Sequence, residues 1–219
     1  MDNTRTGHPI AEAVPERYAI ASNSAIGLVT VLSSAQSPYR RYRLTADDYH
    51  RMAKAGIFAE EDRVELIEGE IIEMAPIGSR HAAYVARLQR LLERSAGDQA
   101  IIWVQNPVVL NDQSEPEPDI CLLRPRRDFY ASAHPHPADV VLIIEVADIS
   151  LAYDRDVKLP LYARQGIPEV WIVDLENGCL HVFTGAAETG YRQTQTFAEP
   201  GLRTLGALPD CPVDLSGLF

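Results

Sequence analysis

The chain has 219 residues, of which 46% are hydrophobic and 23% charged, a composition that excludes a disordered or fibrous protein. Its 20 Lys and Arg residues against 31 Asp and Glu residues give a net charge of −11, which excludes non-specific wrapping of nucleic acid by a basic surface but leaves a local basic groove open. Three cysteines form no CxxC pair, so we expect reduced thiols and a cytoplasmic protein. The apolar run 25–32 is too short to span a bilayer, and no membrane association is expected.

The N-terminal part of the chain divides into an arm and the start of a domain. Residues 1–38 show no sustained periodicity and are predicted to form a flexible N-terminal arm, followed by one domain over residues 39–219. Residues 45–56 predict a short helix, because Thr45 can cap it, acids follow in the first turn and a glycine ends it. Apolar and acidic residues alternate over 64–74 on both sides of Glu68-Gly69, which predicts a β-hairpin with one face buried.

The middle of the chain predicts a long helix followed by strands. Apolar residues recur at helical spacing over 79–97. The segment 101–110 predicts a strand with an edge or bulge at its proline, and 119–123 predicts a second, short one. A proline-rich loop over 124–137 leads into 139–147, which is nearly all apolar and typical of a central strand covered on both faces.

The C-terminal part predicts a second long helix and more strands. The helix covers 154–165, and Pro160 within it marks a kink or a late start of regular turns. The strands are expected at 169–175 and 179–184 around an Asn-Gly turn, and at 191–197 on a sheet edge, before a short helix or turn at 213–219. The predicted fold class is therefore α/β, with a mixed sheet whose central strands are flanked by two long helices.

Two carboxylates are candidates for chemistry. Asp119 begins a short strand, and Glu145 lies inside the most apolar strand of the chain. An ionised carboxylate in such a strand is unfavourable unless a cation or strong donors meet it. Glu145 is therefore either a functional acid or a structural one, satisfied by an arginine or by backbone amides.

Three further positions could complete a site. Lys158 follows Asp154 by four residues, so the two share one helical face, and a plain ion pair on a solvated face is the alternative. Glu65 and Glu68 lie three apart in the hairpin, so only one of them can point into a site on a regular strand.

Other residues have simpler expected roles. His81, in the first turn of the long helix, is expected to cap the helix or lie at the core edge, with a phosphate contact if the helix faces the site. Tyr153 and Tyr162 are expected to pack in or beside the core.

Four runs of the sequence resemble a known family. VELIEGEIIEMAP, NPVVLNDQSEPEPDICLL, VVLIIEVADIS and YDRDVKLPLYARQGIPEVWIVD are similar to the Uma-type restriction endonucleases of the PD-(D/E)XK nuclease superfamily, over about residues 42–219. The resemblance implies a restriction-endonuclease-like mixed sheet flanked by helices and a Mg²⁺-dependent nuclease site, with Mn²⁺ as a substitute metal. It implies that Asp119 and Glu145 bind the metal. The superfamily lysine usually lies two residues after the second acid, where this chain has Ala147. By the resemblance, Lys158 matches a lysine that this family carries on the following helix. Glu65 or Glu68 matches an early glutamate of related nucleases.

The function expected from these features is metal-dependent hydrolysis of phosphodiester bonds in DNA, most simply double-stranded. The alternatives are a catalytically inactive relative that binds nucleic acid or a partner protein, and a phosphohydrolase of small substrates with a deep closed pocket. A homodimer is expected, because two copies could pool their few basic residues in one groove. His81, Arg80 and Arg87 are candidate DNA contacts, and the other groove candidates are Arg90, Arg94, Arg124, Arg126 and Arg127.

Overall fold

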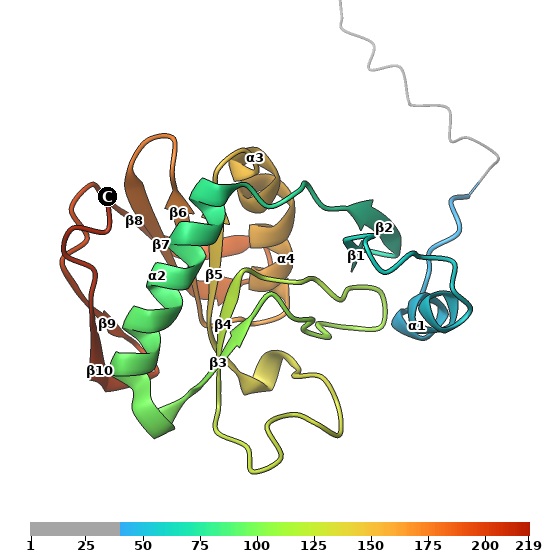
Figure 1. The fold of residues 1–219 in the computed structure, drawn as a ribbon, viewed down its shortest axis with the longest axis horizontal. Helices are drawn as coiled ribbons and strands as arrows, with labels where there is room; N and C mark the ends of the chain where they lie inside the picture. Colours follow the sequence, from blue (N-terminus) through green and yellow to red (C-terminus); the bar gives the residue numbers. More distant parts are fainter. Residues whose placement is uncertain (1–39) are drawn as a thin grey trace, which may run out of the picture. The chain divides into compact units, whose positions relative to one another are not determined.

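A six-stranded mixed sheet forms the centre of the structure, a computed structural model that describes residues 40–219 (Figure 1). The predicted arm over residues 1–38 lies outside the described residues. The strand order is β3-β4-β5-β6-β7-β8, in which β5 and β6 are parallel and the other neighbours are antiparallel. This confirms the predicted α/β class with a mixed sheet. The strands are β3 (Ile101–Val104), β4 (Ile120–Leu123), β5 (Val140–Ala147), β6 (Glu169–Asp174), β7 (Cys179–Ala187) and β8 (Gly190–Phe197).

Each face of the sheet is covered by one long helical segment. Helix α2 (Ser79–Ala96) covers one face of the sheet (Figure 1). Its side chains Val85, Leu88 and Leu92 pack onto that face. The other face is covered by a continuous helical segment made of α3 (Leu151–Tyr153), a π-helical turn (Asp154–Lys158) and α4 (Leu159–Arg164). Because β5 is buried along its whole length, each of its side chains lies in one of these two layers. Two 3₁₀ turns, Gly97–Gln99 and Pro137–Asp139, complete the helical elements.

The N-terminal helix and hairpin pack on a loop of the sheet rather than on the sheet itself. Helix α1 (Ala46–Lys54) is capped by Thr45 in a capping box, and the hairpin β1 (Val64–Ile67) and β2 (Glu70–Glu73) turns at Glu68-Gly69, as predicted. Leu66 and Glu115 exchange backbone hydrogen bonds of 3.3 and 2.7 Å. The loop between β3 and β4 therefore holds the hairpin at the end of the sheet where β4 begins.

The predicted strand over 101–110 is too long. β3 ends at Val104, and Gln105 takes a positive φ of 49°. Pro107 follows and has no N–H to continue the ladder. Beyond it the chain turns back on itself, because the Leu110 N–H donates to the carbonyl of Ser114 at 2.9 Å.

The predicted helix or turn over 213–219 is also wrong in its first part. A second hairpin, β9 (Leu202–Leu205) and β10 (Leu208–Asp214), was not predicted. Only the last residues of the chain, after β10, form a turn. Alternate residues Cys211, Val213 and Leu215 are buried, and Val213 and Leu215 belong to the core cluster that includes α2. Within the described residues, no helix is both long and apolar enough to cross a membrane.

Candidate active site

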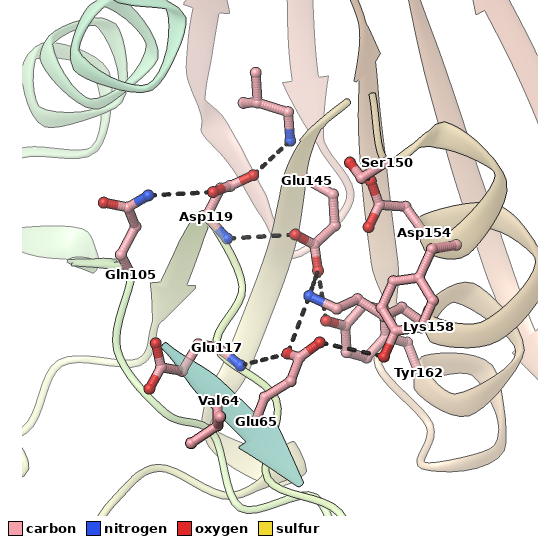
Figure 2. A network of polar contacts seen from close by, with 12 residues as sticks. Val64, Glu65, Gln105, Glu117, Asp119, Glu145, Ser150, Asp154, Lys158 and Tyr162 are labelled. Carbon is pink, nitrogen blue, oxygen red and sulfur yellow. Dashed lines mark hydrogen bonds and ion pairs between the residues drawn. The ribbon is translucent and has the colours of Figure 1, made fainter. Parts of the chain in front are cut away.

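Two acids from neighbouring strands meet at one end of the sheet. Ile120 pairs with Ile144 across β4 and β5, so Asp119, just before β4, lies beside Glu145. The backbone N–H of Asp119 donates to Oε2 of Glu145 at 3.4 Å (Figure 2). The N–H of Val146 donates to Oδ2 of Asp119 at 2.8 Å. The two acids that the sequence singled out therefore share one site.

Lys158 reaches this site from the helical layer. Its ammonium nitrogen lies 3.3 Å from Oε1 of Glu145 and 3.2 Å from Oε2 of Glu65, so the lysine bridges two buried carboxylates (Figure 2). Asp154 does not pair with it directly. Its carboxylate instead accepts a 2.6 Å hydrogen bond from the Ser150 hydroxyl, so the alternative of a plain Asp–Lys pair on a solvated face is wrong.

A π-helical turn supplies the geometry of that layer. It spans Asp154–Lys158, and both end residues are buried. Pro160 lies in the first turn of α4, where its missing N–H and its ring disturb regular α-helical hydrogen bonding with the preceding turn. π-turns inside helices are frequent at functional sites. The sequence predicted a kink or a late start of regular turns at Pro160; the helical segment in fact begins at Leu151, and regular α-helix resumes at Leu159 after the π-turn.

The hairpin contributes Glu65 and not Glu68. Glu65 is 1% exposed and accepts the backbone N–H of Glu117 at 3.1 Å in addition to Lys158. Glu68 lies in the turn, where its exposed carboxylate pairs with Arg164. The sequence left open whether Glu65 or Glu68 points into the site, and Glu65 is the one that lies there.

Two tyrosines do more than pack. The hydroxyl of Tyr162 donates to Oε1 of Glu145 at 2.6 Å (Figure 2). The hydroxyl of Tyr153 donates to Oε1 of Glu65 at 3.3 Å. The expectation that they only pack in or beside the core is thus incomplete. A signal existed in the sequence, because Tyr162 follows Lys158 by four residues and a buried tyrosine hydroxyl needs a partner.

The charges of this site are strongly perturbed. Burial raises the pKa of Glu145 well above its ordinary value, and it raises the pKa of Asp154 to about 6. Burial alone would lower the pKa of Lys158, but the carboxylates around it, led by Glu145 and Glu65, outweigh burial and raise it. The lysine is therefore held as an ammonium ion among an excess of acids.

A pocket of about 400 Å³ gives solvent access to the site. Asp119, Glu145 and Lys158 line it, and its rim includes Ile149, which is 83% exposed. The pocket is therefore open, unlike the deep closed pocket expected for a phosphohydrolase of small substrates.

His81 lies in the same pocket and contacts an acid of the site. Its Nε2 is 3.0 Å from Oδ2 of Asp119, and this hydrogen bond raises the pKa of the imidazole. Among the described residues, its buried Nδ1 has no hydrogen-bond partner. The sequence predicted a capping or core-edge role for His81, with a contact at the site only if the helix faces it, and did not predict the contact with Asp119.

The two arginines predicted beside His81 are engaged elsewhere. Arg80 donates to the carbonyl of Leu175 and pairs with Asp148 at 3.4 Å. Arg87 donates to the carbonyl of Leu218 at 3.1 Å. Neither lines the pocket, so their contact with DNA stays a prediction.

The donor set of the pocket suits a hard divalent cation. Carboxylate oxygens are the ligands that Mg²⁺ prefers, and one or two carboxylates are its usual protein ligands. Oδ1 of Asp119 and Oε2 of Glu145 each have one weak contact at 3.4 Å, whereas the other oxygen of each acid holds a hydrogen bond of 2.8 Å or less. Of the four oxygens of these two acids, Oδ1 of Asp119 and Oε2 of Glu145 are therefore the least engaged by protein donors.

Comparisons with known proteins agree with this architecture. The comparison with curated proteins gave no match. Among solved structures, a protein from Anabaena variabilis described as a "putative nuclease belonging to DUF820" matches with a TM-score of 0.63 and 19% identity, over 79% of this chain and 94% of that one, which shows a shared fold. A family model described as "Uma2: Putative restriction endonuclease" matches residues 46–215. The chain therefore belongs to the Uma2 family.

Proposed function

We propose that this chain is a metal-dependent endonuclease that hydrolyses phosphodiester bonds in DNA, with Mg²⁺ held by Asp119 and Glu145. One observation carries the proposal: two acids from adjacent strands and a lysine 3.3 Å from one of them line a single open pocket. The family description supports the same class of reaction. Mn²⁺ is expected to replace Mg²⁺, because it prefers similar oxygen ligands.

The metal ion and the residues of the site have separate roles in this proposal. Mg²⁺, when bound, polarises a phosphoryl oxygen and lowers the pKa of a bound water. Lys158 is held by two carboxylates as an ammonium donor, so its role is to stabilise negative charge on the phosphate and not to accept a proton from water. Glu65 and the Tyr162 hydroxyl orient Lys158 and Glu145 and thereby fix the geometry of the pair.

His81 has a positioning role in this proposal. When its Nε2–H donates to Oδ2 of Asp119, Nδ1 carries the lone pair. Because the contact engages Oδ2, Oδ1 of Asp119 is the oxygen that would hold a cation. His81→Ala is therefore expected to weaken Mg²⁺ binding by about 10–100-fold without removing a metal ligand.

Double-stranded DNA and a homodimer are part of the proposal. A single chain of charge −11 has few cations to offer a polyanion, and a two-fold dimer doubles them in one groove. Arg90 and Arg94 of α2 and the arginines of the 124–127 loop are the candidates for that groove. Sedimentation velocity at micromolar concentration, with and without a short duplex, tests this part separately.

The decisive experiment is a Mg²⁺-dependent cleavage assay on supercoiled plasmid, with single-stranded DNA and RNA as further substrates. Wild type should nick or linearise DNA with Mg²⁺ and lose activity with EDTA, and Asp119→Ala should be inactive. Asp98→Ala, which removes an exposed aspartate after α2, is the matched control and should remain active. DNA binding without cleavage under all metal conditions would favour the inactive relative, and equal activity of Asp119→Ala and wild type would reject the site.

A further inference from the structure

A second cluster of metal-ligating side chains lies on the β6–β7 hairpin. The Nε2 atom of His181 is 3.4 Å from the sulfur of Cys179 and 3.5 Å from Oδ2 of Asp174. One ligand atom from each residue lies within 4.8 Å of the others. None of the three lines the pocket of Asp119 and Glu145, so the cluster is a separate feature of the molecule.

Strand register brings these three residues together. Asp174 ends β6 and pairs with Cys179 at the start of β7, across the four-residue connection that contains Asn177-Gly178. His181 follows Cys179 by two residues, so both point to the same face of the sheet. The cluster therefore rests on a regular strand pair and needs no rearrangement to form.

The spacing matches a tetrahedral transition-metal site. Zn–S, Zn–N and Zn–O bonds of about 2.3, 2.05 and 2.1 Å at tetrahedral angles place sulfur and nitrogen about 3.6 Å apart and nitrogen and oxygen about 3.4 Å apart. The observed separations are 3.4 and 3.5 Å.

The surrounding residues orient the three donors. Nδ1 of His181 lies 2.9 Å from the Thr196 hydroxyl, an arrangement that suits an imidazole whose other nitrogen binds a metal. The side chain of Asn177 donates to Oδ2 of Asp174 at 2.7 Å, and its backbone N–H donates to Oδ1 at 2.9 Å. Asp174 is 2% exposed, so its carboxylate is fixed in a buried position.

We propose that Asp174, Cys179 and His181 bind a borderline-soft divalent cation of the Zn²⁺ class, with water as the fourth ligand. Mixed sulfur, nitrogen and oxygen donors select Zn²⁺ over Mg²⁺, which prefers oxygen alone. Cys179 binds as a thiolate, and its proton leaves to solvent. The ion joins the end of β6 to the start of β7, so it clips the hairpin next to the central strand β5.

Co²⁺ absorption on the full chain gives the most direct test, because tetrahedral Co²⁺ bound to a thiolate has visible d–d bands and a near-ultraviolet charge-transfer band. Wild type should develop both at one equivalent of Co²⁺, and Zn²⁺, but not Mg²⁺, should abolish them. Asp119→Ala should give the same spectrum, because the band belongs to the hairpin. Absence of a thiolate band in the folded wild type would overturn the proposal without any variant.

Variants then assign the ligands. Cys179→Ala and His181→Ala should lose the charge-transfer band or the tight binding, whereas Cys211→Ala, which removes another buried cysteine, should keep both. Thr196→Val leaves the three ligands intact and should weaken Zn²⁺ binding by about 10–100-fold, measured by competition with a chelating dye. Zn²⁺ affinity unchanged in Cys179→Ala, with native circular dichroism, would refute the site.

Discussion

Replacing Glu145 by glutamine separates a metal-binding role from a structural one. The Lys158 ammonium lies 3.3 Å from Glu145, a gross attraction of about 5 kcal/mol at an effective dielectric constant of 20. Burying the carboxylate costs several kcal/mol, which offsets this attraction. Because Glu65 remains 3.2 Å from the ammonium in the variant, the lysine keeps a partner. We therefore expect Glu145→Gln to change the free energy of unfolding by no more than about 1.5 kcal/mol in EDTA at pH 7.

The double variant Glu65→Gln/Glu145→Gln should behave differently. It removes both carboxylates that Lys158 contacts within 4 Å and leaves the buried ammonium with only the more distant Asp154 and Asp119 as counter-charges. Breaking a buried pair in this way costs about 3–5 kcal/mol. The two substitutions should therefore be strongly non-additive, which urea denaturation of the four proteins in a double-mutant cycle will measure.

The pH dependence of this comparison has a defined sign. Burial raises the pKa of Glu145, so the folded protein keeps this proton to a higher pH than the unfolded chain does. Wild type therefore loses stability from Glu145 as the pH rises above the unfolded value of about 4.3. Glutamine does not titrate, so the stability of Glu145→Gln relative to wild type should improve between pH 4 and pH 8.

Mg²⁺ completes the experiment. An ion that binds only the folded state stabilises it by about 2.7 kcal/mol at 100 times its Kd. Wild type should show this shift in thermal melts, and Glu145→Gln should not. If Glu145→Gln alone loses about 3–5 kcal/mol in EDTA and still responds to Mg²⁺ as wild type does, Glu145 is a structural partner of Lys158 and the reasoning fails.

Three further predictions concern neighbours of the site. Tyr162→Phe removes the 2.6 Å hydrogen bond to Glu145 and should lower the free energy of unfolding by about 1–3 kcal/mol, measured in urea. Asp154→Asn should gain stability relative to wild type as the pH rises from about 4 to about 6 and then level off, because burial raises the pKa of Asp154 to about 6; a pH-independent difference would contradict this. Glu68→Gln breaks only an exposed pair with Arg164, so stability should fall by at most about 1 kcal/mol and plasmid cleavage should equal that of wild type.

Local signals in the sequence predicted the elements that local physics determines. The Thr45 capping box follows from a polar cap and an acid three residues later. The turn at Glu68-Gly69 has positive φ at both residues, as a two-residue hairpin favours, and a Cβ on Gly69 would lie 2.7 Å from the Arg43 side chain. The apolar composition of β5 likewise follows from burial on both faces.

Long-range packing decided what the sequence could not. Alternation in the first hairpin predicted one buried face, yet Glu65, Leu66 and Ile67 are all buried, because the loop after β3 covers the second face through its pairing with Leu66. That docking is what turns Glu65 inward. The hairpin β9–β10 was missed although the two residues Gly206-Ala207 connect its strands, because Pro209 and Pro212 lie within β10 and prolines argue against a strand.

The position of the lysine follows from the alternation of β5. Ile143 and Ala147 belong to the core layer beneath α4, and Glu145, between them in the period of two, points to the same layer, whereas Ile144 and Val146 face α2. A side chain from the α3–α4 segment can therefore reach Glu145 as directly as one from position 147 on the strand. The small side chain of Ala147 leaves room in that layer for a side chain of the helical segment. The π-turn ends at Lys158, whose ammonium lies 3.3 Å from Glu145. The site requires a cation on the buried face of β5. A lysine two residues after the acid and a lysine on the covering helix both meet this requirement. The absence of a lysine from position 147 therefore does not remove the site.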